Sequence, residues 1–239
     1  MTRSERLERI QQDITESTKK SGREPGSVSL VAVSKTFAAD DVAAFAALGH
    51  LDFGENKVQE FLRKKEEIDR RLPENNLRWH VIGHLQRNKA KEIVGKTQLF
   101  HALDSIKLAS SLNLQLDRIA ESMDCLVQVN VSGEASKFGI DPPDLNNFLE
   151  SLHEQPNLRI HGLMTLASPS DNPEDVRGEF AQLRQLSESV QDLFFDPSRV
   201  HLSMGMSHDF KVAIEEGATI IRVGSSLFGS RDYSTAPSQ

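Results

Sequence analysis

Short apolar runs recur along this chain, and turn-type residues separate them. One such run, Leu30 to Val33, follows the turn residues Pro25 to Ser27. Several runs are continuously apolar rather than alternating, which is typical of parallel strands buried on both faces. The pattern predicts eight strands, at residues 28–34, 51–53, 78–83, 99–103, 125–131, 159–165, 199–203 and 219–223.

Between these runs, apolar residues recur with the spacing of amphipathic helices. Ser105 has the chemistry of an N-cap, and both the Pro142-Pro143 pair and Pro173 suit helix starts. A further helix precedes the first strand and ends near Gly22. The stripes that predict these helices are Leu7, Ile10 and Ile14; Val42, Phe45 and Leu48; Val58 and Leu62; Ile106, Ala109, Leu112, Leu116 and Ile119; Leu145, Phe148, Leu149 and Leu152; and Val176, Phe180, Leu183, Val190 and Leu193.

Strand then helix, repeated eight times, is the pattern of an α/β protein of the (β/α)8 TIM barrel type. A doubly wound open sheet would also explain the alternation, but it would have to arrange eight strands in a rather short chain. No strong repeat or linker divides the sequence. We therefore expect one barrel domain over residues 1–233, with an extra N-terminal helix, and a short disordered tail over residues 234–239.

Composition narrows the possible functions. The 239 residues carry a formal net charge of −7, which argues against general nucleic-acid or anionic-membrane binding. No apolar run approaches membrane-spanning length, and the charged N-terminus lacks the apolar core of a signal peptide. The one cysteine, Cys125, lies in an apolar run, so we expect a core residue and no internal disulfide. A reducing, cytoplasmic location fits this cysteine usage.

Lys35 stands where the first predicted strand would leave the core. A solvated strand-end lysine is the commoner outcome for this residue type. The alternative is a reactive amine that forms a Schiff base. Such an amine must be neutral to attack an aldehyde, and desolvation in a barrel mouth favours the neutral form.

Two late loops carry glycine and serine directly after a predicted strand. His201 to Asp209 contains Ser203 and Gly205, and Ile221 to Gly229 contains Gly224 and Ser225. In barrels, the loops after the last strands recurrently bind phosphate through backbone amides. Each loop could also be a simple tight turn, but two in adjacent late positions favour an anion site.

Arg222 lies within the last predicted strand, where a buried arginine needs a partner. That partner is either a nearby carboxylate or a ligand group such as a ring nitrogen or a phosphate. At the second strand end, Glu55 suits a helix start, and Asn56 is either a cap or a polar ligand contact. His80 and His84 lie four residues apart on a predicted strand, too far for an easy shared ion, so we expect no metal site.

Several of these segments together resemble one family. VAVSKTF, FGENKVQE, WHVIGHLQRNK, VNVSGEASKFGI, GLMTL, LSMGMSHD and IRVGSSLFG resemble, in this order, segments of the YggS/PROSC family of pyridoxal phosphate homeostasis proteins. The resemblance extends from about Leu30 to Tyr233, and the ordered set is far more specific than any single motif.

The resemblance implies a single-domain version of the alanine-racemase barrel that carries pyridoxal 5′-phosphate (PLP) as a Schiff base on Lys35. It implies phosphate contacts from Ser203, Met204 and Gly205 and from the second late loop. It also implies that Arg222 faces the pyridine nitrogen and that Asn56 and His80 line the pocket. The cofactor-binding set is then Lys35, Asn56, His80, Ser203, Met204, Gly205, Arg222, Gly224 and Ser225, with no catalytic residue assigned.

Three functions compete. The first is a PLP buffer and carrier that supplies apoenzymes without robust turnover, a role with which weak residual racemase-like activity is compatible. The second is an amino-acid racemase, which needs an acid/base on each face of its substrate. In the related racemases one of these groups is a tyrosine, whereas the one tyrosine here, Tyr233, lies near the end of the chain. The third is a lysine-imine aldolase barrel that binds a sugar phosphate. We favour the first, as a monomer in the cytoplasm.

Overall fold

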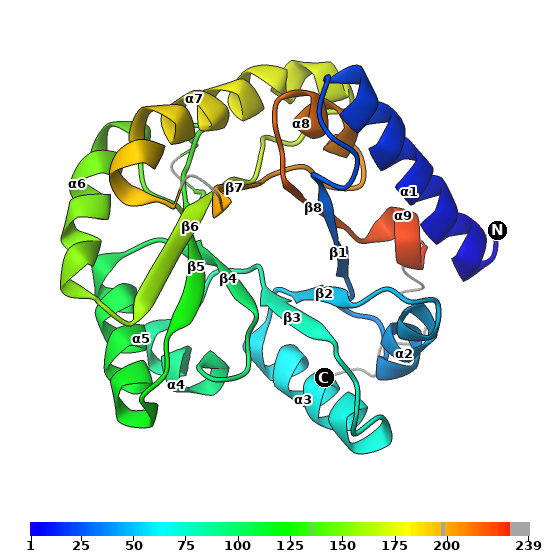
Figure 1. Cartoon of the computed structure of the whole chain (residues 1–239), viewed down its shortest axis with the longest axis horizontal. Coiled ribbons are helices and arrows are strands. Elements are labelled where there is room, and N and C mark those ends of the chain that lie inside the picture. Colours follow the sequence, from blue (N-terminus) through cyan, green and yellow to red (C-terminus); the bar gives the residue numbers. More distant parts are fainter. Residues whose placement is uncertain (135, 197–198, 230–239) are drawn as a thin grey trace.

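The computed structural model describes residues 1–134, 136–196 and 199–229, and Figure 1 shows the barrel that they form. Within these ranges eight parallel strands close in sequence order, with β1 paired to both β2 and β8. The (β/α)8 class predicted from the sequence is confirmed. The strands are β1 Ser29–Val33, β2 Asp52–Glu55, β3 Arg78–Val81, β4 Leu99–Leu103, β5 Met123–Gln128, β6 Leu158–Met164, β7 His201–Ser203 and β8 Ile220–Val223.

Helices surround the barrel on its outside (Figure 1). The α-helices are α1 Arg3–Lys20, α2 Ala39–Ala47, α3 Val58–Arg71, α4 Ala90–Ile93, α5 Ile106–Ile119, α6 Leu145–Ser151, α7 Arg177–Phe194, α8 Phe210–Glu215 and α9 Ser225–Phe228. Short 3-10 turns are η1 Arg87–Lys89, η2 Pro142–Asp144, η3 Leu152–Glu154 and η4 Pro173–Val176. The predicted tail at residues 234–239 lies outside the described residues.

Burial explains why the strand predictions are confirmed. All five residues of β4 are buried, and β1 is buried from Leu30 onward. Strands covered by helices outside and by one another's side chains inside have no solvent face, so they are apolar without alternation. The boundaries shift by a few residues, since β5 begins at Met123 and ends at Gln128.

The predicted helix ends also have their expected chemistry. The Ser105 side chain accepts a hydrogen bond from the Leu108 N–H at the start of α5. Gly22 follows α1 with φ at +68°, a conformation that glycine adopts at little steric cost. Pro142 and Pro173 each begin a 3-10 turn that leads directly into an α-helix. The proline positions therefore predicted where helical structure starts, but not that its first turn is tighter.

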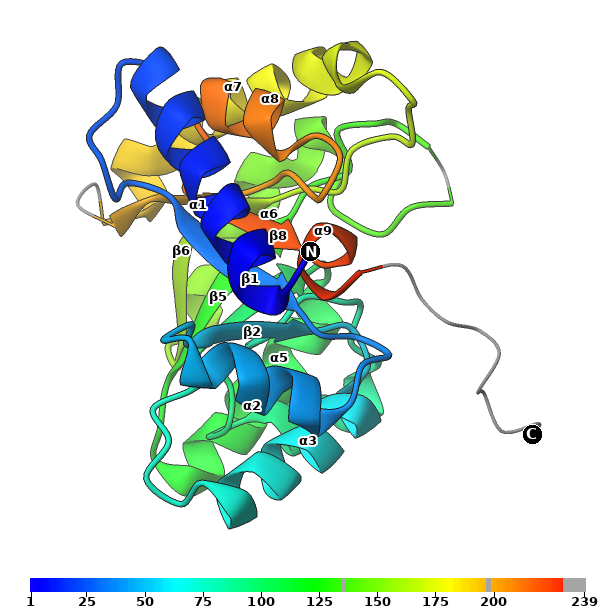
Figure 2. The same cartoon turned by 90° about the vertical axis from the view of Figure 1, so that its right-hand side faces the viewer.

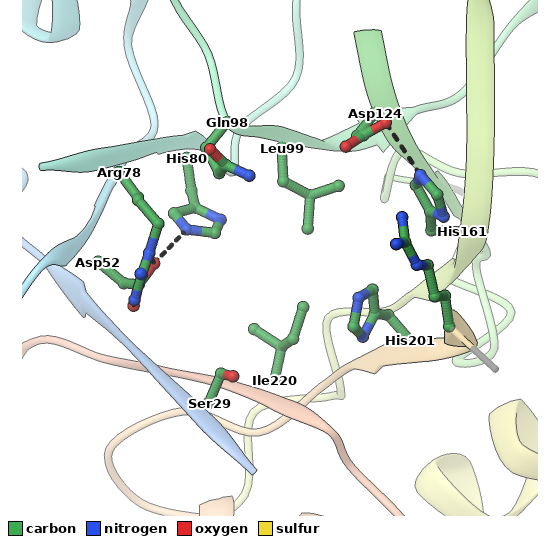
Figure 3. A pocket seen from close by; sticks show the side chains of 11 residues that line it. Ser29, Asp52, Arg78, His80, Gln98, Leu99, Asp124, His161, His201 and Ile220 are labelled. Atoms are coloured by element: carbon green, nitrogen blue, oxygen red, sulfur yellow. Dashed lines mark hydrogen bonds and ion pairs between the residues drawn. The ribbon is translucent and has the colours of Figure 1, made fainter. Parts of the chain in front are cut away.

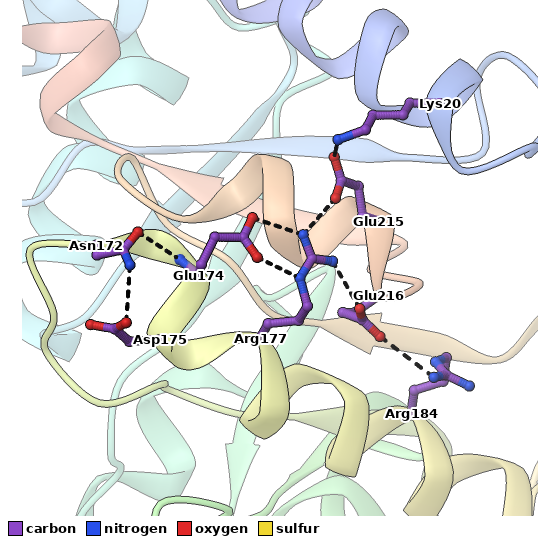
Figure 4. Close-up of polar contacts among 8 residues, drawn as sticks. All are labelled: Lys20, Asn172, Glu174, Asp175, Arg177, Arg184, Glu215 and Glu216. Carbon is purple, nitrogen blue, oxygen red and sulfur yellow. Dashed lines mark hydrogen bonds and ion pairs between the residues drawn. The ribbon is translucent and has the colours of Figure 1, made fainter.

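The extra N-terminal helix is tied to the barrel's outer layer through ion pairs. Helix α1 packs against α8 and α9 (Figure 2). Lys20 of α1 donates to Glu215 of α8 at 2.6 Å, and Arg177 of α7 donates to Glu215 and to Glu216 at 2.7 and 2.9 Å (Figure 4). A shared carboxylate thus joins three helices, an arrangement that contributes more than isolated surface pairs do. None of the helices in the described ranges has the length and apolar run that a bilayer crossing needs.

Candidate functional site

Lys35 lies at the carboxyl end of β1, in a turn, and is half-buried. Its neighbours on both sides are held in place. Ser34 is fully buried, and its carbonyl accepts a hydrogen bond from Lys64 Nζ. The N–H of Thr36 donates to Glu60 Oε1 at 2.5 Å. Thr36 has φ at +71°, which is strained for a β-branched residue, so the turn that presents Lys35 is imposed by its surroundings.

The surroundings that impose this turn form a charged group, which we call the Lys64 cluster: Ser34, Glu55, Glu60 and Lys64. Lys64 of α3 is 1% exposed and donates to Glu55 at 2.7 Å and to Glu60 at 2.8 Å. Ser34 Oγ also donates to Glu55, at 2.6 Å. Burial raises the pKa of Glu55, and the ion pair with Lys64 opposes that change. The base of the Lys35 turn is therefore a buried salt bridge rather than apolar packing.

The late loops lie beside this turn, because β8 pairs with β1 and Ala32 is in register with Val223. Gly224 follows β8, and a Cβ atom placed on it would lie 3.2 Å from the carbonyl oxygen of Val33. Gly205 has φ at +91°, and a Cβ there would lie 2.6 Å from the Cβ of Ala213. Gly205 is thus required at its position, and a side chain at Gly224 would crowd the backbone of β1.

A hydroxyl joins the two late loops. Ser207 Oγ accepts hydrogen bonds from the N–H groups of Gly224 and Ser226, at 3.1 and 3.4 Å. The N–H of Arg222 donates to the carbonyl of Gly205 at 3.0 Å. The two predicted loops are therefore one connected rim, which lies next to the Lys35 turn. Ser225 is exposed on this rim, whereas Met204 is fully buried under it.

Arg222 is buried below the rim, 3% exposed. Within the described residues its guanidinium donates to two neutral oxygens, Ser203 Oγ at 2.5 Å and the carbonyl of Thr165 at 2.8 Å. Burial lowers the pKa of Arg222 to about 10, and the charge of Asp209 partly offsets this. Arg222 therefore stays protonated at neutral pH without a directly bonded carboxylate.

Asn56 is brought to the same end of the barrel and His80 is not. Asn56 follows β2, is half-buried, and packs so closely on the next loop that a Cβ on Gly83 would lie 2.3 Å from its carbonyl oxygen. His80 lies inside the barrel, with Nε2 3.1 Å from Asp52 Oδ1, at the start of β2. Its ring therefore lies toward the opposite mouth, because Asp52 is the first residue of β2.

That opposite mouth holds a cavity of about 380 Å³ (Figure 3). It lies at the amino-terminal end of the strands, since its lining includes the first residues of six of them: Ser29, Asp52, Arg78, Leu99, His201 and Ile220. Asp52 with His80 and Asp124 with His161 face one another across it. In TIM barrels this end serves stability, whereas active sites lie at the carboxyl end.

His84 is the second histidine of the pair considered for a metal ion, and its contacts are local. His84 Nδ1 lies 2.6 Å from Asp104 Oδ2, and its ring stacks on Phe138 at a centroid distance of 3.8 Å. Across the described ranges, no group of three or more His, Cys, Asp or Glu side chains could hold a metal ion. The polar pair of His84 and Asp104 is thus engaged in local contacts.

Three residues that the sequence did not single out belong to the site's surroundings. Ser207 lies in the same segment as Ser203, and its position two residues after Gly205 was the available signal. His101 lies in the apolar run LFHAL, where a histidine on a strand buried on both sides signals a satisfied interior contact. Lys64 carried no signal, because charged residues flank it on α3 and its burial depends on tertiary packing.

Comparisons with known proteins agree with this geometry. A family model described as Alanine racemase, N-terminal domain, matches residues 6–232. The "Pyridoxal phosphate homeostasis protein" of Aquifex aeolicus (strain VF5) is 42% identical over 233 residues, which cover 98% of this chain and 100% of that protein. The crystal structure of "an unknown protein from Bifidobacterium adolescentis" has a TM-score of 0.88 at 30% identity, covering 95% of this chain and 94% of that one.

A second solved structure is PipY of Synechococcus elongatus PCC7942 with PLP bound. Its TM-score is 0.77 at 35% identity, and it covers 90% of this chain and 100% of that one. The likeness therefore extends over nearly the whole chain, both in sequence and in fold, and it agrees with the ordered motifs from Leu30 to Tyr233. The chain belongs to the family of pyridoxal phosphate homeostasis proteins, and its barrel is that of the alanine racemase N-terminal domain.

Proposed function

We propose that this protein binds PLP at the carboxyl end of its barrel, as a Schiff base on Lys35, and acts in PLP homeostasis as a buffer and carrier. The observation that carries the proposal is the meeting of three features at one rim. These are a half-buried amine on a clamped turn, a glycine-lined pair of loops beside it, and a buried arginine bonded to neutral oxygens below. An amine, an anion cradle and a fixed cation match the aldehyde, phosphate and ring nitrogen of PLP.

The residues divide the ligand among them. Lys35 forms the reversible covalent bond to the aldehyde. The backbone of Ser203 to Gly205 and of Gly224, with the backbone and hydroxyl of Ser225, holds the phosphate, and buried Met204 fixes the first loop. Asn56 supplies a polar contact from the second strand's end. His80 contributes through His101 and Ser203 rather than by lining the pocket directly, because its ring lies toward the other mouth.

Arg222 explains why binding is favoured over turnover. A carboxylate beside the ring nitrogen would keep that nitrogen protonated and make PLP a strong electron sink. A guanidinium that stays charged at neutral pH donates a hydrogen bond and disfavours protonation of the ring. A weak electron sink suits a protein that stores a reactive aldehyde. The names of the relatives describe homeostasis and not a reaction, in agreement with this view.

Absorbance spectra with and without added PLP test the proposal. Wild-type protein should become yellow with PLP, and Lys35→Ala should lose the Schiff-base band. Lys57→Ala is the matched control, because Lys57 is an exposed lysine at the start of α3 and should leave the band intact. Borohydride reduction followed by peptide mass spectrometry should locate the PLP adduct on Lys35.

An adduct on another side chain, or none in protein saturated with PLP, would refute the proposal. Trapping of a keto-sugar phosphate by borohydride in colourless protein would instead indicate an aldolase. We further propose that PLP-dependent apoenzymes receive the PLP and that the protein acts as a monomer; light scattering checks the second point. A cytoplasmic location stays a prediction from the sequence.

A further inference from the structure

A continuous line of hydrogen bonds crosses the barrel interior from one mouth to the other. Arg222 lies 2.5 Å from Ser203 Oγ, and Ser203 Oγ lies 2.8 Å from His101 Nδ1. His101 Nε2 lies 2.9 Å from His80 Nδ1, and His80 Nε2 lies 3.1 Å from Asp52 Oδ1. We call these five residues the histidine chain. Each is buried except Asp52, which lines the amino-terminal cavity of Figure 3.

If both imidazoles are neutral, the two ends of the histidine chain fix the direction of every bond in it. A guanidinium only donates, so Ser203 Oγ accepts from Arg222 and gives its own proton to His101 Nδ1. His101 must then carry its proton on Nε2 and donate to His80 Nδ1. His80 in turn carries its proton on Nε2 and donates to the carboxylate of Asp52, which only accepts. In this arrangement both neutral imidazoles are Nε2–H tautomers.

The local electrostatics agree with this assignment. Burial is the main cause that lowers the pKa of His101 well below its usual value, so this imidazole stays neutral. Burial alone would raise the pKa of Asp52, but hydrogen bonds from Arg78 and His80 lower it far below the usual carboxyl range. The chain thus has a fixed positive end, a fixed negative end and neutral links between them.

We propose that Ser203, His101, His80 and Asp52 act as positioning residues for Arg222, extending the PLP site to the opposite mouth of the barrel. The proposal rests on the proposed function, because it takes Arg222 as the group that faces the ring nitrogen of PLP. Ser203 can accept from Arg222 in the right orientation only because its proton is committed to His101. That commitment is maintained link by link as far as Asp52.

The amino-terminal cavity contains its own matched control. Asp124 faces the same cavity and, like Asp52, bonds an arginine and a histidine, in this case Arg159 and His161. His161 is not hydrogen-bonded onward to Arg222 within the described residues; its nearest ring contact is His201, at 6.4 Å between centroids. Asp124→Asn therefore removes a similar carboxylate without breaking the chain.

Nitrogen-15 NMR of the PLP-free protein gives the first test, with a readout independent of PLP. The proposal predicts that His80 and His101 are both neutral Nε2–H tautomers at neutral pH. A protonated imidazole or an Nδ1–H tautomer at either position would overturn the assigned histidine chain, whether or not the protein binds PLP. This test therefore separates a wrong assignment of the histidine chain from a failure of the proposed function.

A double-mutant cycle with PLP gives the second test. Asp52→Asn should change the Kd for PLP by roughly twofold to thirtyfold and shift the absorbance maximum of the bound cofactor, as expected for coupling through a contiguous network. Asp124→Asn should change neither. In a Ser203→Ala background, where the chain is already broken, Asp52→Asn should have no additional effect.

Equal effects of the two aspartate variants, or an Asp52→Asn effect that persists in the Ser203→Ala background, would overturn the proposal. If Asp52→Asn does not fold by circular dichroism, His80→Gln interrupts the chain one link further in and takes its place in the cycle. Wild-type protein that binds no PLP would refute the proposed function. The NMR result would still decide whether the hydrogen bonds of the histidine chain are assigned correctly.

Discussion

The Lys64 cluster and the histidine chain are both polar and mostly buried, but they differ in where their charge lies. In the cluster, one lysine Nζ lies 2.7 and 2.8 Å from two carboxylates behind the Lys35 turn. In the histidine chain as we propose it, charge lies at the two ends, and the links between are neutral. Concentrated buried charge makes each member depend on the others for stability. Neutral links cost less to bury, so the chain can transmit orientation across the barrel at a smaller risk to the fold.

This comparison predicts that the largest loss of stability comes from Lys64→Met. Methionine keeps the length of the side chain but leaves the Glu55 carboxylate buried without its cation, and Glu55 Oε2 already makes no hydrogen bond within the described part of the chain. We expect the free energy of unfolding to fall by about 3–5 kcal/mol, measured by urea denaturation.

Lys65→Met is the matched control for that experiment. Lys65 is the next residue on α3, but its ion pair with Asp69 lies at the surface. We expect it to cost less than about 1 kcal/mol. Losses of similar size in the two variants would show that the cluster is not the charged support of the Lys35 turn.

A smaller loss of stability should appear on acidification, and it should come from Asp52, the negative end of the histidine chain. Asp52 has a folded-state pKa far below its usual value of 3.8, so the unfolded state binds its proton first as pH falls. Asp52 therefore contributes stability above about pH 4 that is lost progressively below it. Asp52→Asn should lower stability at neutral pH by on the order of 1 kcal/mol and flatten this acid dependence, as checked by urea denaturation from pH 7 to pH 2. An acid limb as steep as that of the wild type would contradict the assignment.

The smallest effect should come from Thr36→Gly, which relieves the strained turn while keeping the N–H that donates to Glu60. The left-handed conformation costs a non-glycine residue about 1–2 kcal/mol, and the added flexibility of the unfolded chain offsets part of the gain. We expect a net stabilisation of about 0.5–1 kcal/mol in thermal or urea unfolding.

Ala120→Gly is the control for this variant, because Ala120 is left-handed at the end of α5, away from the rim. It should stabilise the protein to a similar extent and leave PLP binding unchanged. Thr36→Gly should also weaken PLP binding, because a freer turn no longer fixes Lys35. Equal PLP affinities in the two variants would mean that the strain at Thr36 has no part in presenting the lysine.

The sequence predicted the barrel well because its signals are local. Continuous apolar runs such as β4 and the cap at Ser105 need no tertiary information. The adjacency of Lys35 and Gly224 followed from strand order alone, since a closed barrel places its first and last strands side by side.

The depth of a side chain along the barrel axis was not predictable in the same way. Alternation shows that His80 and His101 can face inward, but not which mouth each approaches. The burial of Lys64 was equally hidden, because helical periodicity gives the inward face of α3 and not the neighbours that a charged residue meets there. Both features depend on several strands and helices coming together.

The seam between β1 and β8 gives this protein a built-in order of events during synthesis. Lys35 leaves the ribosome early, while Gly224 and its loop emerge almost two hundred residues later. Until the last strand docks, Lys35 lacks beside it the loop that we propose as the phosphate cradle. On the proposed function, a nascent chain therefore cannot bind PLP fully before it is nearly complete, and the pairing that finishes the fold also assembles the proposed site.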